Sequence, residues 1–397
     1  MTGKRASGLI EEIGNLPFVT LAIITINVVV YLLTRAYLAE AIEYYGLVPC
    51  RFGAGRMVTS TFVHNGIAHL SVNMVLLYIF GRDVERAMGK LEYVLFYIGA
   101  GFAASILHIA IVFACLPAFY ERTTIMGASG AVSGVMGVYA VRFHHKSLRF
   151  GELRLPPLIL IAGWLIVQIV LGIRGLYAQS PQSMAIEPIG YWTHLGGFAF
   201  GMLIALFTNM ALHGEREHLL SEARRHYDDG NLLEAAQNYE SLLRYEPDNA
   251  FAHAELGRIW AILDEDEQSL PYYHVAIELY LTQGNEQQAQ AVAEQLKQFW
   301  PNAELAAATS LRLASYLSET GEPERAVEAL ERIVERDGGV QEAEMSLLKI
   351  GQLQLSALAD PNAAIKTLQT FLDRYPASEW RAFAEQLLAR AKETAGL

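Results

Sequence analysis

The chain has 397 residues, of which 52% are hydrophobic and only 18% are charged, fewer charges than the roughly 25% typical of soluble globular domains. Residues 1–210 carry 14 Lys and Arg against 10 Asp and Glu, whereas residues 211–397 carry 16 against 32. The acidic second half argues against a nucleic-acid-binding protein, which needs a basic face. With Cys50 and Cys115 as the only cysteines, a disulfide framework and a cysteine-based zinc site are excluded, although a single bond between these two stays open.

Apolar runs in the first half predict six transmembrane helices, because a hydrocarbon core of about 30 Å needs about 20 helical residues. The second and fourth runs contain His, Asn, Ser and Gly, and polar groups inside a membrane indicate a functional site. The runs lie at 16–33, 67–80 (extending toward 87), 93–115, 125–141, 155–173 and 191–212. The first half is therefore expected to be an integral, multi-pass membrane domain in a lipid bilayer.

The basic residues of the loops favour one side of the membrane. They precede the first helix and recur after the second and fourth, at 82–90 and 142–154. The positive-inside rule therefore places both ends of the six-helix unit in the cytoplasm. No transit peptide is recognisable, so a bacterial cytoplasmic membrane is the expected location. Within the second basic loop, His144 and His145 are interpreted as solvated loop residues.

After about residue 214, paired amphipathic helices and a returning motif predict a second, soluble domain. The segments GNLLEAAQNYESLLRYEP, GNEQQAQAVAEQLKQFWP, GEPERAVEALERIVERDG and ADPNAAIKTLQTFLDRYP share small and apolar residues at the same offsets. They resemble tetratricopeptide repeats, whose default role is protein docking, with dimerisation as the main rival. The predicted organisation is a cytoplasmic segment 1–15, a membrane domain 16–212 and a cytoplasmic repeat domain 213–397 joined by a short linker at 213–218.

Polar residues of the membrane half gather in three places. His69 and Asn73 are four residues apart on one helical face, Ser129 lies in the segment GASG, and His194 is followed by Gly197 and Gly201 on its own face. Small residues let helices approach closely in lipid, so we expect the fourth and sixth helices to meet along a glycine ridge. The ridge on the fourth helix consists of Gly127, Gly130, Gly134 and Gly137.

This arrangement predicts a serine nucleophile. A serine hydroxyl needs a base to take its proton, and His194 would reach Ser129 at a similar depth. No acidic residue lies near either position except Glu187 in an adjoining loop, so a Ser-His dyad is favoured over a triad. His69 and Asn73 could donate hydrogen bonds to an oxyanion, together with the backbone N–H of Ser129.

The motifs RMVTSTFVH, HLSVNM, GxxxE at 81–85, GASG and HLGGxxxG together resemble the rhomboid family of intramembrane serine proteases over roughly residues 15–210. By that resemblance Ser129 is the nucleophile and His194 the base. His69 and Asn73 match the family's oxyanion positions, His64 its supporting histidine, and Gly127 opens the GASG motif beside them. The position four after the nucleophile is often aromatic in the family and packs on the histidine ring, but here it is Ser133.

The chain is thus predicted to be all-α, a six-helix rhomboid-like bundle followed by a soluble α-solenoid. The family cleaves transmembrane proteins near the outer ends of their spans without metal or ATP, so no cofactor or metal is expected. His64 and His69 lie five residues apart and off one face, which argues against a metal site between them. The alternative is a catalytically inactive rhomboid-like scaffold. In both cases the repeats would bind a protein partner.

Overall fold

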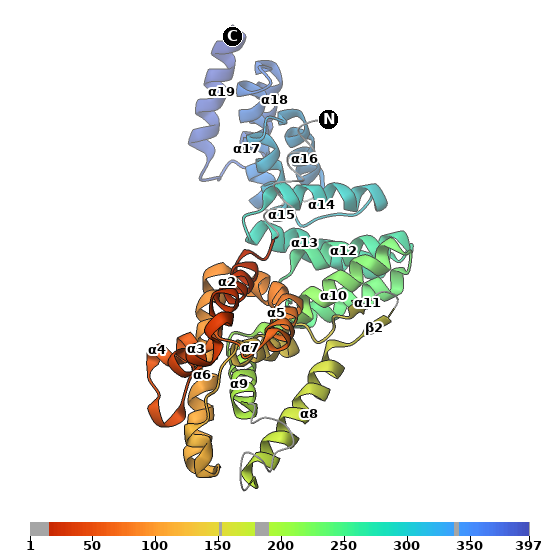
Figure 1. Cartoon of the computed structure of the whole chain (residues 1–397). Helices are drawn as coiled ribbons and strands as arrows, with labels where there is room; N and C mark the ends of the chain where they lie inside the picture. Colours follow the sequence, from red (N-terminus) through yellow and green to blue (C-terminus); the bar gives the residue numbers. More distant parts are fainter. Residues whose placement is uncertain (1–15, 151–152, 179–189, 337–340, 397) are drawn as a thin grey trace, which may run out of the picture. The chain divides into compact units, whose positions relative to one another are not determined.

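A computed structural model of the protein describes residues 16–150, 153–178, 190–336 and 341–396. The chain divides into two compact units, residues 1–218 and 219–397, which are called the membrane unit and the repeat unit below (Figure 1). The expectation of an all-α chain is confirmed in both. The predicted linker at 213–218 is helical, since α10 runs without a break from Met210 to Asp228 and contains the predicted boundary at 212/213.

The six predicted helices of the membrane unit are all present. A short antiparallel hairpin that the sequence did not predict follows the fourth of them, with Leu148 opposite Leu155. Between the first and second, residues 35–66 form short helical pieces. The bounds are α2 Phe18–Thr34, α3 Leu38–Tyr45, α4 Ala54–Thr59, α5 Ile67–Met88, α6 Lys90–Cys115, α7 Ser129–Arg142, β1 Leu148–Phe150, β2 Leu153–Leu155, α8 Pro157–Leu176 and α9 Tyr191–Phe207.

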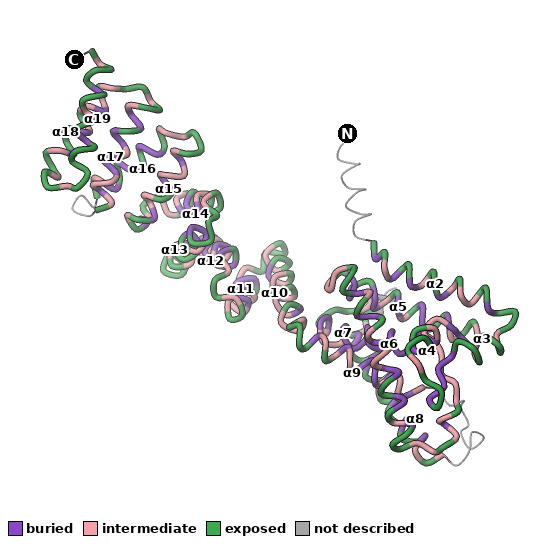
Figure 2. Tube along the Cα trace, turned by 90° about the vertical axis from the view of Figure 1, so that its left-hand side faces the viewer, coloured by how far each residue is buried: buried purple, intermediate pink, exposed green. Residues whose placement is uncertain are grey.

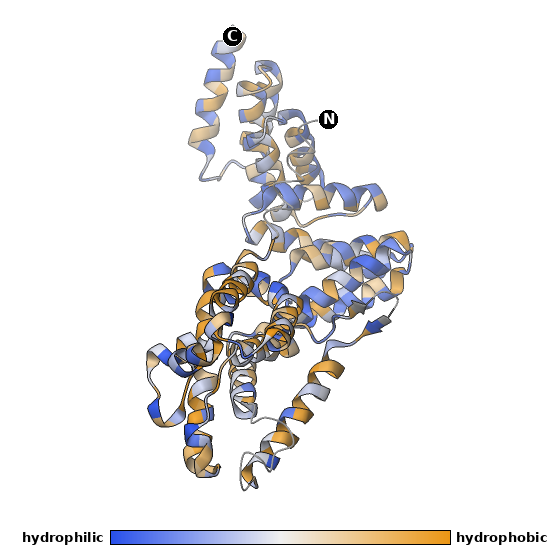
Figure 3. Cartoon of the chain, viewed as in Figure 1, coloured by the Kyte–Doolittle hydropathy of each residue, from blue (hydrophilic) through white to orange (hydrophobic). Residues whose placement is uncertain are grey.

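The membrane character of this unit is visible on its outer faces. Four helical segments of the described chain are long and apolar enough to cross a membrane, and α9 with α10 passes the same test as a pair bent by 69°. Many residues of these helices are exposed (Figure 2) and hydrophobic (Figure 3), as expected where lipid rather than water is the surrounding solvent. Examples are Leu33, Ile67, Leu91, Ile159 and Phe207.

The helix α7 forms the centre of the membrane unit. Its 14 residues span about 21 Å, less than a hydrocarbon core, and every residue from Gly130 to Tyr139 is buried. The backbones of α7 and α9 touch at the predicted glycines: a Cβ on Gly197 would lie 1.9 Å from the Gly130 carbonyl oxygen, and one on Gly201 would lie 2.0 Å from that of Gly134. No side chain fits between the two helices at these positions.

The GxxxE segment at 81–85 forms a structural corner between α2 and α5. Glu85 is buried, and its carboxylate oxygens accept hydrogen bonds from the backbone N–H of Val19 at 3.0 Å and of Thr20 at 2.8 Å. These N–H groups belong to the first turn of α2, where no intrahelical acceptor exists and the helix dipole favours a negative charge. Glu85 therefore fixes the start of α2 against α5.

The repeat unit is a series of helical hairpins continuing from the second half of α10. Its helices are amphipathic, with alternating hydrophilic and hydrophobic faces in Figure 3. The bounds are α11 Leu232–Tyr245, α12 Ala250–Ile262, α13 Asp266–Thr282, α14 Glu286–Phe299, α15 Ala307–Glu319, α16 Pro323–Arg336, α17 Gln341–Ser356, α18 Pro361–Arg374 and α19 Arg381–Ala395.

The repeat motif has a common backbone signature. The first residue of each of the four segments has a positive φ: 79° at Gly230, 72° at Gly284, 86° at Gly321 and 51° at Ala359. The helix that follows each, namely α11, α14, α16 or α18, is 14 residues long. Left-handed backbone ends one helix so that the next can fold back, which explains glycine at three of the four positions.

A fifth unit that sequence analysis missed explains the uneven spacing of the motif. Asp264 has a positive φ of 61°, and Ser269, Tyr273 and Ala276 occupy the motif's buried offsets after it with 0% exposure. The helix α13 that carries them packs against both α12 and α14. The helix α13 is therefore the second helix of one hairpin and the first helix of the next. For this reason, fewer residues separate Asp264 from Gly284 than separate the other neighbouring turn positions.

The glycine contact between α7 and α9 gives a direct test of the membrane unit's packing. We expect Gly197→Ala to destabilise the protein by about 1–3 kcal/mol, the usual cost of overpacking a core, and to lower the thermal unfolding midpoint in detergent. Gly163→Ala on α8 is the matched control, because no described atom outside its own helix backbone lies within 4 Å of a Cβ there. Equal midpoints for both variants would contradict the packing.

Candidate active site

Ser129 and His194 meet at the ends of the two glycine-packed helices. Ser129 is the first residue of α7, and His194 lies in the first turn of α9. The hydroxyl oxygen of Ser129 lies 2.8 Å from Nε2 of His194, and the histidine side chain is buried. Because both helix starts are at the same end of the packed pair, the backbone contact brings the two side chains within hydrogen-bond distance.

The other ring nitrogen of His194 has a partner that the sequence analysis missed. Nδ1 lies 2.7 Å from Oε1 of Gln168, a buried residue of α8, and the ring of Trp164 lies 6.0 Å from the imidazole, centroid to centroid. Gln168 and Trp164 are one turn apart and so share a face of α8. The sequence analysis considered only acidic residues as a third member of the site and so missed the neutral Gln168. A single Gln within an apolar membrane helix does indicate a functional residue, because polar groups are costly there.

Ser133 does not replace the aromatic residue expected four positions after the nucleophile. Its hydroxyl donates a hydrogen bond of 2.6 Å to the carbonyl oxygen of Ser129 within α7. Ser133 therefore does not contact the His194 ring through its hydroxyl, and the ring is oriented by Gln168 and Trp164 of α8. Glu187, the acidic alternative, lies outside the described residues.

His69 and Asn73 of α5 approach Ser129 from the third side. Nδ1 of His69 lies 2.8 Å from Oδ1 of Asn65. The side-chain nitrogen of Asn73 is buried and has no hydrogen-bond partner among the described residues. An unsatisfied buried donor is costly, and this one lines the same cavity as Ser129.

Gly127 faces these two side chains and not α9. It precedes α7, has a φ of +109°, and a Cβ there would lie 2.6 Å from Cε1 of His69 and 3.6 Å from the Asn73 amide nitrogen. The expectation that Gly127 belongs to the ridge against α9 is therefore wrong, whereas Gly130 and Gly134 do belong to it. Glycine is needed here both for its backbone conformation and for the space that it leaves.

His64 supports the turn that presents Ser129. Its ring is buried, and Nε2 accepts a hydrogen bond of 3.3 Å from the backbone N–H of Ala128. The ring also lies edge-on to that of His69, with centroids 5.1 Å apart. The structure thus brings together all six residues that the sequence singled out.

These groups surround a cavity of about 660 Å³. Its lining combines apolar side chains with the polar groups at one end, the composition usual for a ligand-binding site. The lining includes His69, Asn73, Gly127, Ser129, Trp164 and His194.

The comparison with known families decides the identity of this unit, because the rhomboid domain model matches residues 52–211. These residues form a rhomboid domain. RHOMBOID-like protein 4 of Arabidopsis thaliana is 29% identical over 38% of this chain and 32% of its own length. RHOMBOID-like protein 6, mitochondrial, of the same plant is 37% identical over 21% of this chain and 24% of its own length. Rhomboid protease GluP of Bacillus subtilis is 30% identical over 53% of this chain and 42% of its own length.

The chain thus spans less than half the length of each of these relatives. The rhomboid domain carries all six residues of the cluster. A second family model, the tetratricopeptide repeat, matches residues 345–378, which correspond to the hairpin of α17 and α18. The resemblance to both families is confirmed, and the protein is a membrane protein with a helical repeat unit.

Proposed function

We propose that the rhomboid domain is an intramembrane serine endopeptidase with Ser129 as nucleophile and His194 as general base. The observation that carries the proposal is the 2.8 Å contact between the Ser129 hydroxyl and Nε2 of His194. Nε2 accepts the hydroxyl proton as Ser129 Oγ attacks the scissile carbonyl, and returns it to the leaving amine. Water then hydrolyses the acyl-enzyme with His194 again as base, which releases the second product and restores Ser129.

The negative charge on the attacked oxygen needs hydrogen-bond donors placed in advance. The unpartnered amide of Asn73, the backbone N–H of Ser129 and Nε2 of His69 are the candidates. In the structure Asn65 Oδ1 faces Nδ1 of His69, which leaves Nε2 of a neutral His69 as an acceptor. His69 donates from Nε2 once the Asn65 amide turns over and donates to Nδ1. A buried donor with no partner in the resting enzyme gains its hydrogen bond only when the oxyanion forms, which is how such a group accelerates a reaction.

Gln168 acts as the positioning residue for the base. Its Oε1 accepts a hydrogen bond from Nδ1–H of His194, so the lone pair of the imidazole is on Nε2 and faces Ser129. This is the orienting role that a carboxylate plays in a Ser-His-Asp triad. A neutral amide performs it without placing a buried negative charge in the membrane, where charge is expensive.

The substrates proposed are transmembrane proteins cut near the outer ends of their spans. The rival is an inactive rhomboid-like scaffold, which the paired Ser129 and His194 argue against. The basic loops support an orientation with both termini in the cytoplasm. The proposed location is a bacterial cytoplasmic membrane.

The proposal is tested by cleavage of a model transmembrane substrate in detergent. Ser129→Ala and His194→Ala should each abolish cleavage while the proteins stay monodisperse, because paired catalytic groups act as a unit. A variant that retains activity within about tenfold of the unsubstituted enzyme would remove its residue from the mechanism. Inactivity of the unsubstituted protein toward a panel of substrates would favour the scaffold.

Loss of the Gln168 acceptor should lower turnover without weakening substrate binding. A hydrogen bond to a charged group contributes about 1.5–3 kcal/mol, which corresponds to about 10–10²-fold in rate. We expect Gln168→Leu to reduce kcat by this factor with little change in KM, and Gln168→Glu, which keeps an acceptor, to recover most of the loss. Equal kcat for Gln168→Leu and the unsubstituted enzyme would contradict the role.

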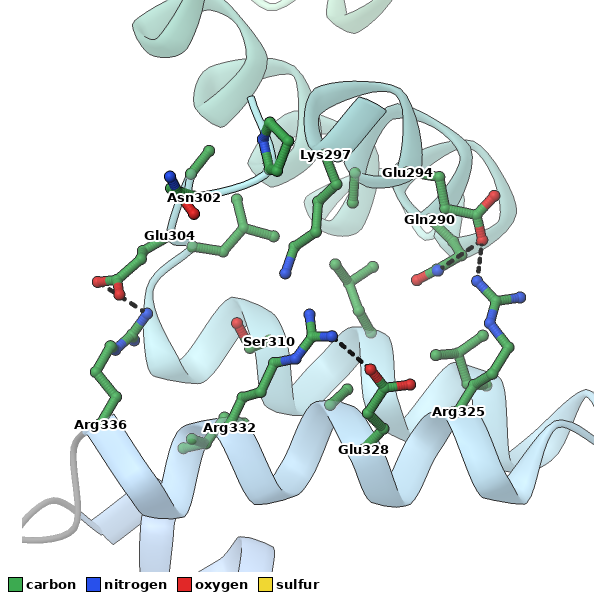
Figure 4. Close-up of a pocket in the computed structure, with 18 of the residues that line it drawn as sticks. Gln290, Glu294, Lys297, Asn302, Glu304, Ser310, Arg325, Glu328, Arg332 and Arg336 are labelled. Carbon is green, nitrogen blue, oxygen red and sulfur yellow. Dashed lines mark hydrogen bonds and ion pairs between the residues drawn. The ribbon is translucent and has the colours of Figure 1, made fainter. Parts of the chain in front are cut away.

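The repeat unit is proposed to bind an acidic segment of a protein partner. A groove of about 890 Å³ lies between α14 and α16, and its lining holds apolar residues, four cations and four glutamates. Arg325, Arg332 and Arg336 each contact a glutamate, whereas Lys297 extends between them and has no ion-pair partner among the described residues (Figure 4). Burial and then the charge of Arg332 lower the pKa of Lys297, whereas the nearby Glu328 and Glu304 raise it. An incoming carboxylate would pair with the Lys297 ammonium.

The groove is tested with a fluorescent peptide of alternating acidic and apolar residues. Full-length protein should raise its anisotropy, and Lys297→Glu should abolish the effect because the groove then repels the peptide. Lys366→Glu on α18 makes the same charge change at an exposed position and should bind as before. Binding that survives Lys297→Glu would place the partner elsewhere.

A further inference from the structure

A second cluster of chemically active side chains lies at the end of α7 remote from Ser129. His144 and His145 follow α7, and Glu215 lies in the second turn of α10. One ring nitrogen of each histidine and one carboxylate oxygen of Glu215 lie within 4.8 Å of one another. His145 is an exposed residue and His144 is half-buried, with 35% and 33% of their side chains exposed. The loop thus has the solvent access expected of it, but both imidazoles also face Glu215.

The imidazole rings are oriented toward Glu215. Nδ1 of His144 lies 3.1 Å from the carbonyl oxygen of Val141, so a proton on Nδ1 leaves the lone pair on Nε2, which lies 3.8 Å from Glu215 Oε2. The Nε2 atom of His145 lies 2.6 Å from the same oxygen. The ring of His145 is stacked on that of His218, with centroids 4.2 Å apart and an angle of 6°. A backbone carbonyl on the second nitrogen is the usual device for aiming a metal-binding histidine.

A separate set of contacts fixes Glu215 opposite the histidines. A Cβ on Gly214 would lie 2.2 Å from the Arg142 carbonyl oxygen, so α10 touches the end of α7 backbone to backbone. The Arg142 side chain is only 6% exposed and its guanidinium donates to Glu217 at 2.6 Å. Lys146, the nearest basic neighbour in the chain, is paired with Asp83 at 3.2 Å. The three candidate ligands therefore converge on a frame that needs no ion to form.

We propose that His144, His145 and Glu215 form a binding site for a divalent metal ion of the zinc class. Two imidazole nitrogens with one carboxylate oxygen suit Zn²⁺ and its neighbours, whereas Mg²⁺ and Ca²⁺ prefer oxygen ligands alone. With metal–nitrogen bonds of about 2.0–2.1 Å, tetrahedral ligands are about 3.3 Å apart. The observed separations from the Glu215 oxygen are 2.6 and 3.8 Å, on either side of this value, and the two histidine nitrogens lie within 4.8 Å of each other. The three ligand atoms would therefore have to shift to seat the ion.

The place of the site indicates a structural role. The length of α7, about 21 Å, separates it from Ser129, so the ion would not touch the reacting groups. It would join the end of α7 to the start of α10, the helix that continues into the repeat unit. Occupancy would therefore stabilise this junction in proportion to the supply of the metal.

The test measures metal binding by the full-length protein, purified in detergent with an affinity tag that contains no histidine. After treatment with a chelator, the protein is titrated with Zn²⁺ in competition with a chromophoric chelator. We expect one tight equivalent per chain that millimolar Mg²⁺ does not displace, and a rise in the thermal midpoint on binding. Co²⁺ in the same site should give the visible absorption of a tetrahedral complex.

Three substitutions decide the assignment. His145→Ala and Glu215→Gln should each weaken Zn²⁺ binding at least tenfold, the loss typical even of an outer-shell partner, and should abolish the Co²⁺ absorption. His213→Ala removes an exposed histidine two residues from Glu215 and should bind as the unsubstituted protein does. Glu215→Gln preserves the side-chain shape and decides the matter if His145→Ala fails to fold. The proposal is overturned by absence of saturable binding, or by equal affinity in Glu215→Gln and His213→Ala.

Discussion

The direct backbone contact between α7 and α9 is the constraint on which the rest of the membrane unit depends. Lipid offers no hydrophobic drive to bring two helices together, so close packing and hydrogen bonds must do so. Gly197 and Gly201 place α9 against the carbonyl oxygens of Gly130 and Gly134. The consequence appears at the helix starts, where Ser129 and His194 are in hydrogen-bond contact. Even one methyl group between the helices would separate these side chains.

The candidate active site is assembled from four helices that use the same spacing. Gly197 and Gly201 on α9 and Gly130 and Gly134 on α7 make the contact, while α5 contributes His69 and Asn73 and α8 contributes Trp164 and Gln168. Each pair is four residues apart and so presents one face of its helix. Three faces thus converge on the start of α7, and in the proposed mechanism each would supply a different group: a base, an orienting acceptor and hydrogen-bond donors. Rigid helices hold such groups more accurately than loops would.

Much of this could be predicted from the sequence because the strongest signals are local. Six apolar runs give the helices, and glycine spacing on two of them gives their contact. Gln168 could not be found in the same way, since its role depends on a tertiary contact 26 residues away in the chain. Gly127 was misplaced because a ridge of four glycines conceals that α7 begins only at Ser129.

Features outside the candidate active site were also missed where they depend on contacts between distant residues or on backbone angles. Asp264 begins a repeat that the sequence analysis missed because this repeat does not start with glycine. The turn requires a positive φ, which Asp264 adopts as well. The approach of His144 and His145 to Glu215 was not predicted, because Glu215 is 70 residues away from His145 in the sequence. In each case the missing information was a long-range contact or a backbone angle.

Covalent labelling of the intact protein by a fluorophosphonate, with the adduct located by mass spectrometry, tests the central claim most directly. A serine whose proton is taken by a neighbouring imidazole reacts with this reagent, whereas an ordinary serine hydroxyl does not. The account predicts one adduct, on Ser129, and its loss in a folded His194→Asn variant. An unlabelled Ser129, or equal labelling in His194→Asn, would contradict it.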